Sequence, residues 1–350
     1  MQTNLMDYNL NELNEIVLSL GESKFRGNQL YNAMLNGKDY EDKINLPKTF
    51  LNNLQQKEFF LQPLKIYKTF SSKDNSTKKF LYKLNDDNIV EGVLMSYKFG
   101  RTLCISTQVG CKMNCSFCAS GLKFTRNLSA GEILGQVVAV NKLLGGTTKK
   151  REITNLVLMG SGEPLDNFEN VTKFLKMVTD ENGFNFSVRN ISVSTCGIPS
   201  KIEALADLGL NVTLCISLHA PNDTIRKKIM PIAKSYNIES VIESAHYYYT
   251  ITNRRIIFEY TLIDEVNSSP KHAEQLANLL QGLTCHVNLI NLNDVPERGL
   301  KGVDDKTRDI FLHTLIKHHI SATVRRSLGD DIGGACGQLR SKELKEKTKN

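Results

Sequence analysis

Three cysteines, Cys111, Cys115 and Cys118, stand close together in a C-x3-C-x2-C spacing. A tetrahedral zinc site, or a cluster held entirely by the protein, needs four ligands, and the next histidine downstream is only His219. Three thiolates on a four-iron cubane leave one iron open, and an open iron can bind and reduce a substrate. The alternatives are three buried structural cysteines or half of a zinc site. The missing fourth ligand favours the open cluster.

The segment before these cysteines, residues 102–109, is rich in β-forming residues, so the loop is expected to follow a strand. A C-x3-C-x2-C loop after a first strand resembles the radical S-adenosylmethionine (radical SAM) superfamily. The resemblance implies that the amino acid part of SAM binds the open iron. It also implies that SAM is cleaved reductively to a 5′-deoxyadenosyl radical.

Strand-like and helix-like segments alternate from about residue 101 to 326. The predicted strands are Leu103–Val109, Ile153–Met159, Ile191–Thr195, Val212–Leu218, Ile256–Leu262, His286–Leu292 and Ala322–Val324. The predicted helices are Ala130–Leu144, Val171–Val178, Lys201–Leu208, Ser240–Tyr249, Ala273–Leu280 and Lys306–His318. This alternation favours a parallel sheet. We therefore expect an α/β fold, a partial (β/α)6 TIM-like barrel of radical SAM type, with its chemistry at the carboxyl ends of the strands.

The rest of the chain divides by its pattern. Residues 1–62 are predicted to be a small helical accessory domain, with helices near residues 10–20, 24–35 and 47–57 and with Phe25 facing inward. Residues 63–100 alternate in hydrophobicity and are predicted to be a β-rich extension. Residues 101–340 would form the core barrel. The polar, lysine-rich residues 341–350 are expected to be a mobile tail.

Composition bounds the class of protein. The 350 residues are 41% hydrophobic and 23% charged, which is typical of a soluble globular protein. No apolar run approaches the ~20 residues of a membrane span, and the N-terminus lacks the pattern of a signal peptide, so a cytoplasmic location is expected. The net charge of +7 is weak evidence for a nucleic-acid partner. Short basic clusters, among them 226–228 and 325–326, could contact phosphates or could be solvated loop charges.

Polar residues follow several predicted strands. Gly162 would let a ligand approach the backbone, and the next residue, Glu163, can accept a hydrogen bond from an ammonium group. Hydroxyl, imidazole and amide groups stand near the ends of later strands, at Ser194, Ser217, His219 and Asn293. Taken singly, such residues are more often strand-end caps than ligand contacts. Glu91 lies in a predicted strand, where a glutamate usually faces solvent, and Cys336 lies among glycines, which suits an accessible thiol.

Together these segments resemble the RlmN/Cfr family of radical SAM RNA adenine methyltransferases, over essentially the whole chain. The segments are residues 20–31, 102–118, 159–165, 217–220, 286–290 and 329–339. The resemblance implies cluster ligands at Cys111, Cys115 and Cys118, and SAM contacts at Gly162, Glu163, Ser194, Ser217, Leu218, His219 and Asn293. It implies that Cys336 becomes S-methylcysteine, that Cys104 forms a transient disulfide with it, and that Glu91 is a proton acceptor.

The activity that the resemblance implies is methylation of adenosine at C2, in 23S rRNA at the peptidyl-transferase centre and in tRNA next to the anticodon. The implied cofactors are one [4Fe-4S] cluster and two SAM molecules per turnover. An external electron donor of the flavodoxin or ferredoxin type would be needed, and the enzyme would be a monomer. Whether Glu91 or Cys104 takes the C2 proton stays open. The preference between the two RNAs stays open as well.

Three alternatives remain at this stage. The same core can methylate C8, as in Cfr, although the Glu163-Pro164-Leu165 segment is more similar to RlmN. The chain could be a radical SAM enzyme that does not act on RNA, or a zinc-bearing RNA-binding module without catalysis. Two departures from the family pattern stand at Ser161, which could loosen a SAM contact, and at Gly333-Gly334, which should make the Cys336 loop more mobile.

Overall fold

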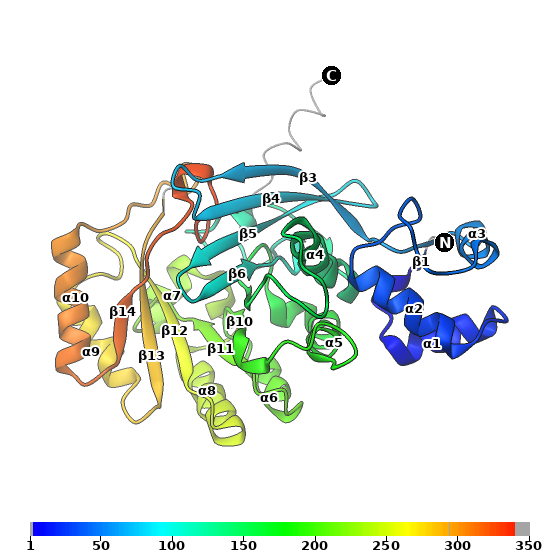
Figure 1. Ribbon diagram of the computed structural model, residues 1–350. Coiled ribbons are helices and arrows are strands. Elements are labelled where there is room, and N and C mark those ends of the chain that lie inside the picture. Colours follow the sequence, from blue (N-terminus) through cyan, green and yellow to red (C-terminus); the bar gives the residue numbers. More distant parts are fainter. Residues whose placement is uncertain (1–2, 294, 340–350) are drawn as a thin grey trace.

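The computed structural model describes residues 3–293 and 295–339. Its main feature is a ten-stranded sheet in the order β14-β13-β12-β11-β10-β9-β6-β5-β4-β3 (Figure 1). The strands of this sheet are β3 (Leu64–Ser71), β4 (Thr77–Leu84), β5 (Ile89–Tyr97), β6 (Gly100–Cys104), β9 (Asn155–Leu158), β10 (Ile191–Thr195), β11 (Thr213–Ser217), β12 (Ile256–Leu262), β13 (Cys285–Asn291) and β14 (Ala322–Val324).

Within this sheet, the strands from β6 to β14 pair in parallel, which confirms the predicted α/β fold. Helices connect these strands and cover the outer face of the sheet (Figure 1). They are α4 (Ala130–Leu143), α5 (Phe168–Thr179), α6 (Pro199–Asp207), α7 (Asp223–Ile229), α8 (Ile238–Thr252), α9 (Pro270–Leu279) and α10 (Asp305–Lys317). Helix α7 was not predicted, because a segment of seven residues with three consecutive basic positions carries little periodic signal.

The predicted strand 103–109 was wrong as a single element. Strand β6 ends at Cys104, and β7 (Gln108–Gly110) leaves the main sheet to pair with β8 (Phe124–Asn127). The break lies at Ser106, whose N–H donates to Gln136 Oε1 (2.9 Å) and whose hydroxyl donates to the Glu91 carbonyl (2.6 Å). These bonds turn the chain away from the sheet and direct the cysteine loop over its carboxyl edge.

Residues 63–100, the β-rich linker or extension expected from the sequence, form strands β3, β4 and β5. Strands β3, β4 and β5 pair antiparallel with one another, and β5 pairs antiparallel with β6, so the extension continues the barrel sheet. Val93 on β5 lies opposite Cys104 on β6, and Leu81 on β4 lies opposite Glu91. Because side chains alternate across a strand, Glu91, Val93 and Cys104 share one face of the sheet.

The N-terminal segment contains α1 (Leu10–Ser19), α2 (Lys24–Leu35) and α3 (Lys48–Gln56), as predicted, together with the short parallel pair β1 (Thr3–Asn4) and β2 (Phe59–Phe60). The helices lie at the opposite end of the molecule from α9 and α10 (Figure 1). Leu30, Tyr31 and Met34 are buried as expected, but Phe25 is 64% exposed, so its inward placement was wrong. The segment joins the core through α4, where Gly131 N–H donates to Asp7 Oδ1 (2.7 Å).

The predicted mobile tail, residues 341–350, lies outside the described residues. Within the described ranges, the structure contains no helix with the length and hydrophobicity needed to cross a membrane.

Candidate active site

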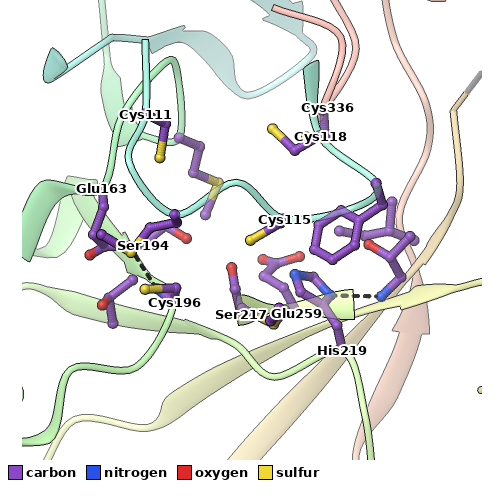
Figure 2. Close-up of a pocket in the computed structure, with 18 of the residues that line it drawn as sticks. Cys111, Cys115, Cys118, Glu163, Ser194, Cys196, Ser217, His219, Glu259 and Cys336 are labelled. Carbon is purple, nitrogen blue, oxygen red and sulfur yellow. Dashed lines mark hydrogen bonds between the residues drawn. The ribbon is translucent and has the colours of Figure 1, made fainter. Parts of the chain in front are cut away.

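A cavity lies at the carboxyl ends of the parallel strands and collects most of the residues singled out in the sequence (Figure 2). Those that line it are Cys111, Cys115, Cys118, Gly162, Glu163, Ser194, Ser217, His219, Asn293 and Cys336. Leu218, between Ser217 and His219, is fully buried and is not among the lining residues of this cavity. The strand ends of the sheet and the two cysteine-bearing loops therefore meet at one place.

The three clustered cysteines lie on the loop between β7 and β8 and face this cavity (Figure 2). Burial raises the pKa of the Cys111 thiol to about 12 and raises the pKa of Cys115 as well. Among the described residues, no set of three Cys, His, Asp or Glu side chains has the geometry for a single metal ion. A four-iron cluster makes a different demand, because each of the three sulfurs binds its own iron.

A buried guanidinium, which the sequence analysis did not identify, lies behind the cysteine loop. Arg226 on α7 is completely buried; its Nη2 donates to the Cys196 carbonyl (2.5 Å) and its Nε to the Leu218 carbonyl (3.3 Å). Its Nη1 has no hydrogen-bond partner among the described residues. Burial lowers the pKa of Arg226, and the nearby Cys196 and Cys115 sulfurs oppose that shift. The donor set of three thiols beside an unpaired buried cation fits an anionic thiolate-bound cluster.

Glu163 closes one wall of the cavity from the loop after β9. Its two carboxylate oxygens accept hydrogen bonds from the N–H groups of Leu165 (3.0 Å) and Cys196 (2.7 Å). Burial raises its pKa, and these two bonds oppose that effect by favouring the carboxylate. The backbone before it is left-handed at Gly162 (φ 112°), where a Cβ would lie 2.7 Å from the Gln108 nitrogen, so this position requires glycine.

His219, at the end of β11, is held in one tautomer. Its Nδ1 accepts from the Thr261 N–H (3.0 Å), so the ring proton is on Nε2. Burial, with the nearby Arg226 charge, lowers its pKa to about 3, and the imidazole is neutral at physiological pH. The Phe117 ring packs edge-on against it at 4.7 Å, which ties the cysteine loop to this strand end. The neutral ring can donate one hydrogen bond into the cavity without adding charge.

A second cavity adjoins the first and contains the two cysteines for which the resemblance implies a role in methyl transfer. Cys104 and Cys336 both line it, and Met159, Asn293 and Arg325 line both cavities. Cys104 is buried and Cys336 is exposed, and burial together with the neighbouring Cys336 raises the pKa of Cys104 to about 12. All eight cysteines are free, so the disulfide implied by the resemblance is not formed in this structure.

Arg325 and Glu259 line the first cavity but were not predicted from the sequence as site residues. Arg325 lies 3.6 Å from Glu259 Oε2, and Asn288 Nδ2 donates to Glu259 Oε1 (3.0 Å). The neighbouring Cys336 sulfur and the Glu259 carboxylate raise the pKa of Arg325. The sequence contained one signal for this pair. Glu259 stands within an apolar strand, and a buried carboxylate needs a partner.

The position of Glu91 corrects the expectation that a strand glutamate faces solvent. Its side chain is 3% exposed, and its carboxylate lies 3.3 Å from Lys79 Nζ. The same Lys79 ammonium donates to the Gly333 carbonyl (3.0 Å), in the loop that carries Cys336. Glu91 is thus buried on the Cys104 face of the sheet, although it is not among the residues that line the two cavities.

The Cys336 loop is held at several points, despite its two glycines. The Gly334 N–H donates to the Gly329 carbonyl (2.7 Å), and the Cys336 carbonyl accepts from Asn293 Nδ2 (3.0 Å). On the other side, the Ala119 N–H in the cysteine loop donates to the Gly337 carbonyl (2.7 Å). These contacts oppose the greater mobility that the glycine pair suggested. Ser161 is buried and is not among the cavity-lining residues.

Comparisons with known proteins agree with this geometry. Residues 105–278 match the Radical SAM superfamily. The chain is 47% identical to a probable dual-specificity RNA methyltransferase RlmN of Clostridium tetani, over 99% of this chain and 98% of the relative, and 44% identical to that of Clostridium perfringens, over 98% of each.

A crystal structure of a radical SAM methyltransferase from Sphaerobacter thermophilus superposes with a TM-score of 0.92 at 40% identity, covering 97% of this chain and 99% of the other. The likeness includes the N-terminal helices and the antiparallel extension, because nearly the whole of both chains is aligned. The chain therefore belongs to the RlmN family of dual-specificity RNA methyltransferases, within the radical SAM superfamily.

Proposed function

We propose that this protein methylates C2 of an adenosine in 23S rRNA, at the peptidyl-transferase centre, and in tRNA next to the anticodon, giving 2-methyladenosine. The observation that carries the proposal is the position of Cys336. It lines one cavity together with the three loop cysteines and a second cavity together with Cys104. A methyl group on the Cys336 sulfur would therefore be accessible from the cavity of the three loop cysteines, and its carbon could be transferred to a base in the cavity of Cys104.

The residues for the cofactors follow from the first cavity. Cys111, Cys115 and Cys118 would hold a [4Fe-4S] cluster, and the strand-end residues would bind SAM: Gly162, Glu163, Ser194, Ser217, Leu218, His219 and Asn293. When bound, these groups supply a methyl group for the Cys336 sulfur and a 5′-deoxyadenosyl radical that removes a hydrogen atom from that methyl. The strand-end residues would orient SAM, and Phe117 and His219 would close the cavity around it.

Cys336 and Cys104 divide the transfer between them. C2 of adenine is electron-poor and is no nucleophile, so the carbon must arrive on a sulfur atom. The thiolate of Cys336 is the nucleophile that first takes the methyl group. After the carbon has bonded to C2, the adduct would return one electron to the oxidised cluster and lose the C2 proton to a base, Glu91 or Cys104. Attack by the Cys104 thiolate on the Cys336 sulfur would then break the S–C bond, and the released carbon would take up a proton to become the methyl group. A disulfide forms, and an external two-electron reductant reopens it.

The RNA substrate must present the adenine out of its stack, because the base has to enter a cavity at the mouth of a half barrel. An enzyme that acts on ribosomal and transfer RNA would work in the cytoplasm, and it would act as a monomer. A flavodoxin- or ferredoxin-type donor would deliver the electrons for cluster reduction.

Replacing Cys336 tests the proposal most directly. Cys336→Ala should remove all 2-methyladenosine, because no sulfur remains to carry the carbon, while reductive cleavage of SAM to 5′-deoxyadenosine persists. Cys285→Ala removes a buried thiol outside both cavities and should leave product formation unchanged. Mass spectrometry of digested RNA measures the product and resolves C2 from C8. Normal product from Cys336→Ala would refute the proposal, and 8-methyladenosine from the wild type would replace it by Cfr-like chemistry.

A further inference from the structure

We propose that Tyr97 and Phe99 form a stacking platform for a nucleobase that neighbours the target adenosine in the RNA. The proposal rests on the RNA methyltransferase function above and adds a binding subsite to it. The two aromatic residues lie in the hairpin that joins β5 to β6, at the edge of the cavity that contains Cys104 and Cys336.

The two rings are already arranged as a stack. Their centroids are 4.9 Å apart and their planes differ by 8°. Phe99 is 75% exposed, the largest exposed fraction among the exposed large hydrophobic residues of the described chain. An aromatic ring left in water forgoes the stabilisation of burial, and nothing in the packing of the hairpin requires a phenylalanine there. One face of the Phe99 ring is covered by Tyr97, and its other face is available to a planar group.

The platform is continuous with the proposed transfer cavity. Tyr97 lines that cavity together with Cys104 and Cys336, and it packs against the small cluster of Val93, Met95 and Cys104. The Tyr97 hydroxyl contacts Met95 Sδ at 3.5 Å, and the backbone of Tyr97 pairs with Gly100 at the hairpin end. Tyr97 therefore has a fixed place in the cavity wall, and Phe99 extends the aromatic surface from that wall to the outside.

Two exposed cations, Lys98 in the same hairpin and Arg326 on the cavity rim, favour a polyanion as the ligand of the platform. Lysine and arginine beside a stacked aromatic surface are the combination that binds single-stranded nucleic acid, with cations on phosphates and rings on bases. A nucleotide next to an adenine that is inserted at Cys336 can thus contact both an aromatic ring and a cation.

Stacking also suits an enzyme that must accept two RNAs. Every base has a π-face, so a stacking contact tolerates different sequences, whereas hydrogen bonds to base edges do not. The platform would hold the strand beside the inserted adenine without reading the identity of the neighbouring base. An apolar peptide side chain could also cover Phe99, but it would leave the flanking cations without a partner.

The test uses the holoenzyme and anticodon stem-loop RNAs that carry 2-aminopurine on the 5′ or the 3′ side of the target adenosine. Binding of the wild type should quench the fluorescence on one side, because the fluorescent base stacks on the rings. Phe99→Ala should abolish this quenching and raise the Kd for the RNA about 10-fold, within the range of one lost stacking contact. Phe99→Trp should restore both. Phe25→Ala, at a 64% exposed phenylalanine on α2, is the matched control and should behave as the wild type.

The outcomes separate this proposal from the function on which it rests. Equal quenching and equal Kd in the wild type and in Phe99→Ala would overturn the platform, while 2-methyladenosine formation by the wild type would keep the function. A wild type that binds these RNAs without forming 2-methyladenosine would overturn the function. A melting temperature of Phe99→Ala equal to that of the wild type, expected for so exposed a residue, assigns its loss of quenching to the lost contact and not to unfolding.

Discussion

The two sides of the active cavity are built in different ways. On the cofactor side, Glu163 and His219 sit at strand ends, and each accepts hydrogen bonds from backbone N–H groups of a neighbouring strand or loop. On the transfer side, Cys336 lies on an exposed loop that is held from outside, by Lys79 Nζ on the Gly333 carbonyl and by Asn293 Nδ2 on the Cys336 carbonyl. Glu163 and His219 are thus fixed by the strands of the sheet, whereas the Cys336 loop is attached to the sheet through a few side chains.

This difference matches the tasks of the two sides. A cofactor site gains from groups that are fixed before binding, since no energy is then spent on reorientation. A transfer loop has to meet Cys104, the cofactor side and an RNA base in turn, so a few separate anchors suit it better than burial in a strand. Substitutions on the cofactor side should therefore affect folding and cofactor binding together, and substitutions on the transfer side should affect methylation more than cofactor binding.

Arg226→Met should give the largest effect and tests the cofactor side. Methionine fills much of the same volume but removes the buried cation and leaves the Cys196 and Leu218 carbonyls without their donor. We expect a loss of about 4 kcal/mol in the free energy of unfolding, about 2 kcal/mol for each buried carbonyl left without its donor, and fewer iron atoms per chain after reconstitution. Denaturant unfolding and iron analysis measure these quantities.

The midpoint reduction potential of the reconstituted cluster gives a second readout for Arg226→Met. Loss of a neighbouring positive charge should make the potential more negative. Arg189→Met, at an exposed arginine, should change none of the three quantities. Unchanged stability and unchanged potential in Arg226→Met would show that the buried cation does not support the cofactor side.

Lys79→Met should give an intermediate effect and tests the transfer side. The ammonium links Glu91, on β5, to the Gly333 carbonyl in the Cys336 loop, so its loss frees the loop at one anchor. We expect about 2 kcal/mol of lost stability and about 10-fold slower RNA methylation, a factor that corresponds to about 1.4 kcal/mol. The ratio of 2-methyladenosine to 5′-deoxyadenosine formed measures the uncoupling. Lys78→Met, at the next position on the opposite face of β4, should keep the wild-type ratio. A proportional fall of both products in Lys79→Met would contradict the proposed division between the two sides.

The sequence predicted the cofactor side better than the transfer side, because the cofactor side depends more on residues that are close together in the chain. Cys111, Cys115 and Cys118 are near neighbours in the chain, and Glu163 lies in the loop after a predicted strand, so spacing and strand order indicated that they share one end of the sheet. Lys79 and Gly333 are 254 residues apart, and only the tertiary structure brings them together. The burial of Glu91 was missed for the same reason, since it depends on the antiparallel strands continuing the barrel sheet.

The basic clusters show where charge patterns mislead. The sequence at 226–228 suggested three cations that could contact phosphates, but Arg226 is completely buried while Lys227 and Lys228 are exposed. Similarly, Arg325 is directed at Glu259 and Cys336, and its neighbour Arg326 is exposed. Adjacent residues on a helix or strand face different directions, so a run of like charges does not establish one surface.

The smallest predicted effect concerns His219 and appears only with pH. Burial lowers its pKa to about 3, whereas the unfolded chain has an ordinary value of about 6.5. Between these two values the unfolded state binds a proton that the folded state does not, so stability falls as the pH falls below about 6.5, by about 1.4 kcal/mol per pH unit at most. Above about 6.5 both states are neutral and this contribution is constant. His219→Gln should therefore have a shallower dependence between about pH 6.5 and about pH 5, measured by urea unfolding, and the exposed His318→Gln should follow the wild type. A wild-type slope in His219→Gln would mean that the imidazole accepts a proton in the folded protein, and the cofactor side would then be less rigid than its hydrogen bonds indicate.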